Sequence, residues 1–147
     1  MATAYNRIHL RGPYAQFEEA LASGTVKPGH LLELTDASAD TVKAHATAGG
    51  FSERAFALED ALQGNDVDDD YSAADRVQYV LAQPGDIVFA WIVAGEDISK
   101  GDQLISSGDG TLKETTGTPS QIIAVALEDL DLSASGAVNT RLACRVL

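Results

Sequence analysis

Two stretches in the middle of the chain have the residue pattern of β-strands: the first alternates between apolar and polar positions, and the second is apolar on both faces. Residues 76–81 (RVQYVL) and 86–93 (DIVFAWIV) are rich in the β-branched and aromatic residues that favour strands. Residues 83–86 (QPGD) between them are typical of a type II turn, because proline fixes the first central φ and glycine accepts the positive φ that follows. The pattern therefore predicts a hairpin across residues 76–93.

The last nine residues, NTRLACRVL, alternate in the same way. They predict a C-terminal strand with one apolar and one basic face, on which Arg141 and Arg145 point outward. Cys144, the only cysteine, has no partner for an intramolecular disulfide, and its place in the alternation predicts a buried small hydrophobe.

The hydrophobic pattern of the first half recurs in the second. The tetrapeptide ALED occurs at residues 57–60 and again at 126–129. Before each copy come, in the same order, an apolar residue, a glycine turn, an apolar strand, a polar tip and a return strand. We interpret residues 24–60 and 95–129 as two copies of one supersecondary unit. In the first copy, HLLELT and TVKAHAT flank a small acidic tip at 36–40, which predicts a hairpin.

Helix signals are few. Pro13 is followed by YAQFEEALASG, which places Phe17 and Leu21, with Tyr14 nearby, on one helical face and ends at Gly24. This segment predicts a short helix before the first repeat.

A second helix is possible in SERAFALEDAL, where Ser52 could cap the first turn. Its repeat partner, QIIAVALEDL, is too β-branched for a helix, so we predict a strand over residues 55–59. The fold class is therefore mainly β: a compact β-barrel or sandwich with an internal pseudo-repeat, one or two short helices and an extended N-terminal arm. The arm comprises residues 1–13, and residues 14–147 form a single β-rich domain.

Composition narrows the possible partners. The formal net charge of −12 argues against nucleic acid, because affinity for nucleic acid comes mainly from lysine and arginine at phosphates. The chain has no apolar run as long as a bilayer and no signal-peptide core, so we expect no membrane partner and synthesis in the cytoplasm. Residues 1–17 differ from the rest, with Arg7 and Arg11 but no acidic residue.

Candidate chemistry is sparse. Asp66, Asp68 and Asp70 alternate as calcium ligands do, but the glycine and the final acid of an EF-hand loop are missing, which favours a solvated acidic loop. His9, His30 and His45 are not at ligand spacing. A Ser-His-Asp triad stays open, because its members can be distant in sequence, but no motif supports one. We therefore predict no catalytic, cofactor-binding or metal-binding residue, and no enzyme.

The arm and one strand supply candidates for partner binding. In AYNRIHLR, apolar residues alternate with basic ones, as expected of a strand that adds to the edge of a neighbour's sheet, although a frayed terminus fits equally. In the strand 86–93 both faces are apolar, so one face is either core or packed on another subunit. The candidate residues are Tyr5, Arg7, Ile8, His9, Leu10, Arg11 and Trp91.

Several strings in the chain resemble the capsid decoration, or cement, proteins of tailed bacteriophages. They are GTVKPGHLLELTDA, ERAFALEDALQG, PGDIVFAW, ISKGDQL and IIAVALE, and the similarity runs from about residue 24 to the C-terminus. The resemblance implies a small β-rich virion protein on the outer capsid surface. It binds the major capsid protein, stabilises the head, and forms trimers or, less often, dimers.

Three alternatives stay open. One is a stand-alone carbohydrate-binding module that uses Trp91, Tyr71 or Tyr79 as a stacking platform. A second is a small β-barrel hydrolase of the dUTPase type, whose glycine-rich signature loops are missing. A third is a phage tail component, because the same strand and turn patterns serve throughout a virion.

Overall fold

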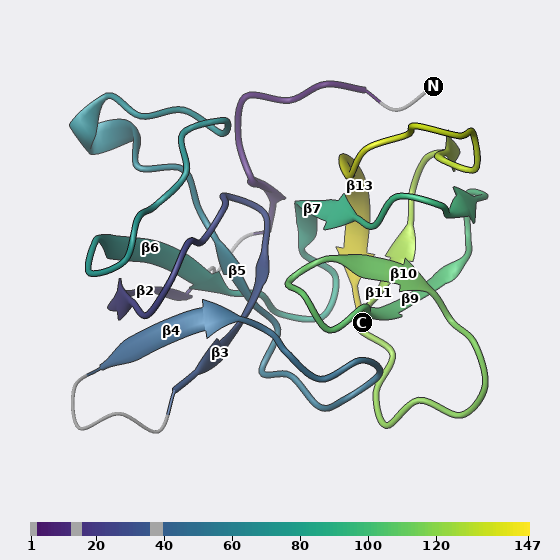
Figure 1. The fold of residues 1–147 in the computed structure, drawn as a ribbon, viewed down its shortest axis with the longest axis horizontal. Coiled ribbons are helices and arrows are strands. Elements are labelled where there is room, and N and C mark those ends of the chain that lie inside the picture. The colour runs from purple at the N-terminus through teal and green to yellow at the C-terminus, as the bar shows by residue number, and fades with distance from the viewer. Residues whose placement is uncertain (1–2, 13–15, 36–39) are drawn as a thin grey trace.

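The computed structural model describes residues 3–12, 16–35 and 40–147, and this part of the chain is almost entirely β-structure (Figure 1). The only helical element in it is a single 3₁₀ turn, η1, so the one or two short helices predicted from the sequence were wrong. None of its helical segments is long and apolar enough to cross a membrane. The strands are β1 His9–Arg11, β2 Gln16–Ala22, β3 Leu31–Leu34, β4 Thr41–Ala44, β5 Ala55–Ala57, β6 Arg76–Leu81, β7 Ile87–Ile92, β8 Asp97–Ile98, β9 Gln103–Ser106, β10 Leu112–Glu114, β11 Ala124–Ala126, β12 Leu130–Asp131 and β13 Thr140–Val146, with η1 at Ala61–Gln63.

Ten of these strands form two closed five-stranded barrels, one from each half of the chain. The first has the order β2-β4-β3-β5-β6, and the second has the order β7-β10-β9-β11-β13, closed by β13 on β7. The two rings match strand for strand. In each, only the first pair is parallel (β2 with β4, β7 with β10), and every other pair is antiparallel. The internal pseudo-repeat is therefore confirmed, and the repeating unit is a whole barrel.

The registers of the barrels also correspond. Ala22 lies opposite Val42 in the first barrel, and Ile92 lies opposite Leu112 in the second, each 70 positions further along. The predicted strand at 55–59 is confirmed over residues 55–57 as β5, and its repeat partner is β11. The tip of the β3–β4 hairpin at 36–39 lies outside the described residues.

The predicted helix before the first repeat is a β-strand. β2 pairs with β6 over six residues, and its small side chains Ala20 and Ala22 alternate into the first barrel. A helix here would leave the edge of β6 without partners, so ring closure overrides the helical preference of Glu, Ala and Leu. Pro13 and Tyr14 lie outside the described residues.

The predicted hairpin across 76–93 is also wrong in one respect. Both strands exist, and the turn between them has Gly85 at φ 98° with the Asp86 N–H donating to the Gln83 carbonyl at 3.0 Å. The strands do not pair, because β6 closes the first barrel on β2 and β7 opens the second. The turn therefore links two barrels.

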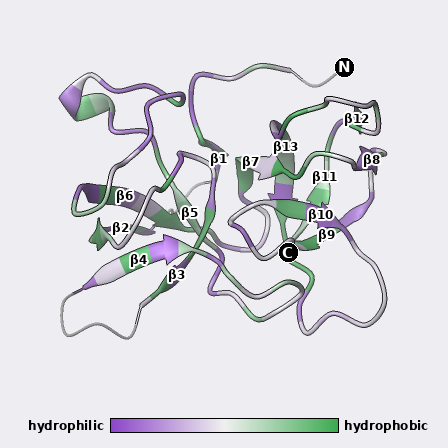
Figure 2. Cartoon of the chain, in the orientation of Figure 1, coloured by the Kyte–Doolittle hydropathy of each residue, from purple (hydrophilic) through white to green (hydrophobic). Residues whose placement is uncertain are grey.

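The barrels pack through strands that are apolar on both faces. Leu32, Ala55 and Tyr79 point into the first barrel. Their neighbours Leu31, Phe56 and Val80 lie side by side on the outer face of β3, β5 and β6 and join the core of the second barrel. In Figure 2 the strands carry hydrophobic segments beside hydrophilic ones, as this alternation requires.

Cys144 lies inside the second barrel, as predicted. Burial raises the pKa of its thiol, so the unreactive protonated form dominates at neutral pH.

Candidate partner-binding surface

An aromatic and cationic cluster covers the outer face of β7. Trp91 and Phe89 project from this strand, and Arg141 stands directly opposite Trp91 on β13. The Arg141 guanidinium lies 4.1 Å from the centre of the Trp91 ring and 5.9 Å from that of Phe89. Stacking of this kind stabilises a partly desolvated cation.

Arg141 also joins two segments of the first half to the second barrel, the turn at Pro28 and the loop at 67–68. Its Nε donates to the Pro28 carbonyl at 3.0 Å, its Nη1 donates to Asp68 at 2.9 Å, and its Nη2 donates to the Val67 carbonyl. The Trp91 indole N–H donates to the same Pro28 carbonyl at 2.8 Å. Arg141 is only 8% exposed, so its predicted place on an outer basic face was wrong, whereas Arg145 is exposed as predicted.

The N-terminal arm lies on the same face, on its own chain. The Phe89 N–H donates to the Ile8 carbonyl at 2.7 Å, and β1 continues along β7 with His9 opposite Val88. Ile8 is 0% exposed and packs with Val67 and Phe89, and Tyr5 meets the Phe89 ring edge-on at 5.2 Å. The arm therefore supplies the hydrophobic cover that the apolar outer face of β7 needs.

Carboxylates of the barrels hold the arm at three places. Glu59 accepts the Ile8 N–H at 3.0 Å, and Glu128 accepts both the backbone N–H and the hydroxyl of Thr3, at 2.9 and 2.6 Å. His9 lies 3.5 Å from the buried carboxylate of Asp86. Each contact pairs the acid-free arm with the acidic body of the protein.

The seven candidates thus divide into two groups. Tyr5, Ile8, His9, Leu10 and Trp91 are buried or half-buried against the chain's own second barrel. Arg7 and Arg11 are exposed, and Arg7 reaches Glu59 only at 4.0 Å. A shallow groove runs between the arm and the barrel, lined by Thr3, Ala4, Tyr5, Asn6, Val67, Asp68, Phe89, Trp91, Asn139, Thr140 and Arg141. The exposed surface open to a partner is therefore the basic side of the arm and this groove.

A second polar cluster joins the barrels elsewhere. His45 follows β4, and its Nδ1 lies 2.7 Å from the Ser106 hydroxyl at the end of β9. Its Nε2 donates to the Phe51 carbonyl at 2.8 Å and lies 3.8 Å from Glu33. The arrangement resembles a Ser-His-acid triad, but Ser106 is 0% exposed, so a substrate could not reach its hydroxyl.

Replacing Ser106 with alanine is expected to lower the free energy of unfolding by about 1–3 kcal/mol, because the buried Nδ1 of His45 loses its partner. Urea denaturation measures this change. Ser99→Ala, in an exposed turn, is the control and should be nearly neutral. An equal effect of both substitutions would contradict the assigned role of the buried pair.

The acidic residues are mostly engaged with the chain itself. In the loop 66–70, Asp68 pairs with Arg141, Asp70 lies 3.6 Å from Lys27, and Asp66 accepts the Asp68 N–H at 2.8 Å. This agrees with the predicted solvated loop and adds a role for Asp68. Among the described residues, no group of three or more potential ligands is placed to hold a metal ion.

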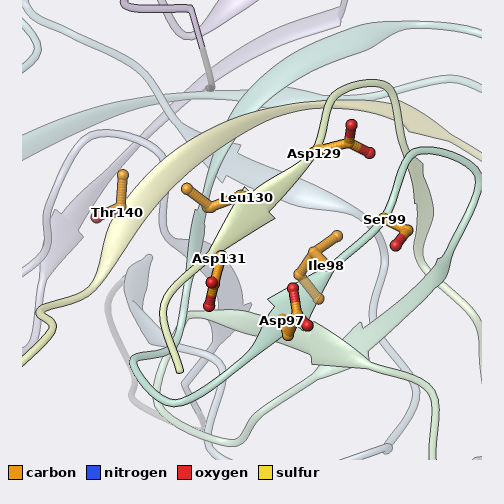
Figure 3. Close-up of a pocket in the computed structure, with 7 residues that line it drawn as sticks. All are labelled: Asp97, Ile98, Ser99, Asp129, Leu130, Asp131 and Thr140. Carbon is orange, nitrogen blue, oxygen red and sulfur yellow. The ribbon is translucent and has the colours of Figure 1, made fainter. Parts of the chain in front are cut away.

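A pocket at the far end of the second barrel is also acidic (Figure 3). Asp97 and Asp131 stand directly opposite each other on β8 and β12, with Ile98 and Leu130 beside them. Hydrogen bonds from the Ser133 side chain and backbone lower the pKa of Asp131. The pocket combines like charges that repel across the strand pair with an apolar floor.

Two of the three aromatic residues proposed for a carbohydrate platform are buried. Tyr71 and Tyr79 lie inside the first barrel, and the Tyr71 hydroxyl donates to the Leu58 carbonyl at 2.6 Å. One face of Trp91 carries Arg141, and its N–H is already bonded. Tyr71 and Tyr79 are therefore too buried to stack on a sugar, whereas Trp91 is half-buried and lines the groove beside the arm.

Comparison with known proteins gives one informative result. No family model matches the chain, and no curated protein matches it. Among solved structures, it is similar to the N base of head fiber gp8.5 of bacteriophage phi29, with a TM-score of 0.60 and 18% sequence identity. The match covers 91% of this chain and 95% of that one. At this identity the likeness establishes a shared fold.

Proposed function

We propose that this protein is a structural component of a bacteriophage virion that binds the outer surface of the assembled head. The likeness of nearly the whole chain to a phage head fiber base carries the proposal. The sequence strings that resemble capsid decoration proteins support the proposal independently, because they are a likeness of sequence and the head fiber base is a likeness of fold.

The finer form of the proposal is a cement protein. Each oligomer, a homotrimer in preference to a dimer, contacts adjacent copies of the major capsid protein and links them. Several weak contacts then add up, because linked binding events raise affinity by about a hundred- to ten-thousandfold. The strongly acidic body fits a site on the outer shell, away from packaged DNA.

The direct test adds purified protein to expanded heads that lack it. Co-sedimentation with the heads and greater resistance of the heads to heat or chaotropes are the expected results. Normal sedimentation of heads without bound protein would contradict the proposal.

A charge reversal tests the role of the arm. Deletion of the arm is a poor test, because it would also remove the buried Ile8 and uncover Phe89. Replacing the exposed Arg7 and Arg11 with glutamate is expected to lower the apparent affinity for heads by about tenfold or more, because each lost contact is multiplied over the oligomer. Each arm reversal is also compared singly with Lys100→Glu, an exposed change of equal charge on a distant turn that should bind normally. Equal losses would contradict a specific role of the arm.

The likeness to a head fiber base favours a second candidate, the base of a head fiber. In that case the protein would bind heads and also carry a projecting part. Electron microscopy of heads decorated with the protein, isolated with its natural partners, distinguishes a low surface knob from a fiber that extends beyond it.

A further inference from the structure

The two barrels differ in one strand position. In the second barrel an added strand occupies it, and among the described residues of the first barrel no strand does. In the second barrel, β10 pairs with β7 only at Ile92, and the arm strand β1 takes the preceding part of the same edge. The Phe89 N–H donates to the arm, and two residues beyond Trp91 the Val93 N–H donates to β10 at Leu112. One edge of β7 is thus shared between a ring strand and an added strand.

The matching edge in the first barrel has the ring strand but not the added one. Among the described residues, β4 pairs with β2 only at Leu21 and Ala22. The Ser23 N–H donates to Val42 as the Val93 N–H donates to Leu112, so the 70-residue equivalence extends to the hydrogen bonds. By the same offset, Glu19 corresponds to Phe89.

The hydrogen bonds that β2 makes show in which direction its other backbone N–H groups point. The Leu21 and Ser23 N–H groups donate toward the β4 side, to Asp40 and Val42. Backbone groups alternate along a strand, so those of Phe17 and Glu19 also face this side, while the residues between them bond to β6. Among residues 3–12, 16–35 and 40–147, the first half of β2 therefore has no partner on this edge, and such an edge is a template for strand addition.

We propose that the first half of β2, Gln16 to Ala20, accepts an extended strand from a partner protein in which apolar side chains alternate with basic ones. The apolar requirement comes from Phe17, which is 60% exposed on this strand. The basic requirement comes from Glu18 on the strand and Asp40 beside it, and from the exposed Glu19, which also pairs with Arg76 at 3.3 Å. Glu18 stands opposite Tyr79, and burial, together with Glu18, Glu53 and Asp40, raises the pKa of that tyrosine.

The chain's own arm has the required chemistry but is already engaged. Its apolar and basic residues alternate, and it occupies the equivalent edge of β7 with Ile8 fully buried. The arm of a second copy would have to leave the same site, so another protein must supply the strand. This inference identifies a surface and a partner chemistry, and it does not depend on head binding.

The experiment uses a synthetic peptide of residues 3–12, TAYNRIHLRG, as a probe of the full-length protein, whose own arm fills β7. Amide hydrogen exchange is followed by NMR at Phe17, Glu19 and Phe89. We expect the Phe17 and Glu19 amides to exchange rapidly in the free protein and slowly with peptide, while Phe89 is protected throughout.

The discriminating variant is Glu19→Pro. Proline is tolerated where the N–H points away from the ladder, so the barrel should form, but the strand loses a donor to the added peptide. Peptide affinity is expected to fall about tenfold or more, which corresponds to about 1.4 kcal/mol. Glu19→Ala, which removes the charge but keeps the N–H, is the matched control and should lose less.

Three results would overturn the proposal. One is a Glu19 amide that is already protected in the free protein, and another is equal peptide binding by Glu19→Pro and the parent. The third is self-association of the free protein that Glu19→Pro abolishes, because a second copy would then be the occupant.

Discussion

Replacing Arg141 with alanine is expected to lower the free energy of unfolding by about 3–5 kcal/mol, the largest effect of any single substitution proposed for this protein. The guanidinium is the common donor for the Pro28 and Val67 carbonyls, both from the first half of the chain. Without it, the Val67 carbonyl loses its partner, the Pro28 carbonyl keeps only the Trp91 N–H, and a void opens beside the Trp91 ring. Trp91 is the only tryptophan, so its fluorescence during urea denaturation reports the transition.

The molecule contains its own control. Arg76 lies opposite Leu21 in the first barrel as Arg141 lies opposite Trp91 in the second, but its guanidinium is exposed and pairs with Glu19 at 3.3 Å. Arg76→Ala should therefore change stability by only about 0–1 kcal/mol. Arg141→Lys should recover only part of the loss, because an ammonium group cannot stack flat on Trp91 and donate in three directions. Similar values for Arg141→Ala and Arg76→Ala would contradict this account.

The comparison of the two arginines shows what the sequence could not reveal. Both belong to alternating strands with the same outward direction, and alternation alone predicts exposure for both. Arg141 is buried because the Pro28 turn and the 67–68 loop cross over β13. These contacts join residues that are more than 70 positions apart, and no local pattern encodes them.

Strand positions were predictable where both repeats carried the same signal. The segment 55–59 has a helical composition, but its β-branched partner copy correctly favoured a strand. A helix was predicted in place of β2, because its Glu and Ala residues favour a helix and the predicted repeats begin only after this strand. Its equivalent is β7, which is apolar on both faces and bears no resemblance to β2 in composition.

The pairing of strands was harder to predict than their positions. A Pro-Gly turn between two strands fits a hairpin, yet here it joins separate rings because each strand already has two partners in its own barrel. The strand β7 is apolar on both faces, and this property led to the expectation that one face contacts another subunit. The chain's own arm and first barrel satisfy that requirement.

The second large effect concerns pH. His30 ends the turn that leads into β3, and burial, with Lys27 beside it, lowers its pKa to about 4. Asp109 and Asp70 oppose this shift, and Arg141 adds to it. The folded protein therefore favours the neutral ring, whose Nδ1 accepts the Lys27 N–H at 3.3 Å.

The sign follows from linkage. The unfolded chain binds a proton at His30 near pH 6.5, whereas the folded chain does so only near pH 4. The stabilisation is complete above pH 6.5 and is lost as the pH falls toward 4, by about 2–3 kcal/mol in total. Urea denaturation at pH 7.5 and 4.5 measures this loss, although carboxylates also titrate in that range, so a reference variant is required.

His30→Asn is that reference, because its side-chain oxygen can accept the Lys27 N–H but does not titrate. The difference between the parent and this variant should shrink as the pH falls, since only the parent loses the His30 contribution. The consequence is structural, because His30 packs against Gly110, where an added Cβ would lie 2.9 Å from the imidazole Cγ. Next to it, the Leu31 N–H donates to the Gly110 carbonyl across the two barrels. A protonated His30 ring would therefore weaken the contact between the two barrels. A difference in unfolding free energy between parent and variant that does not change with pH would contradict this role.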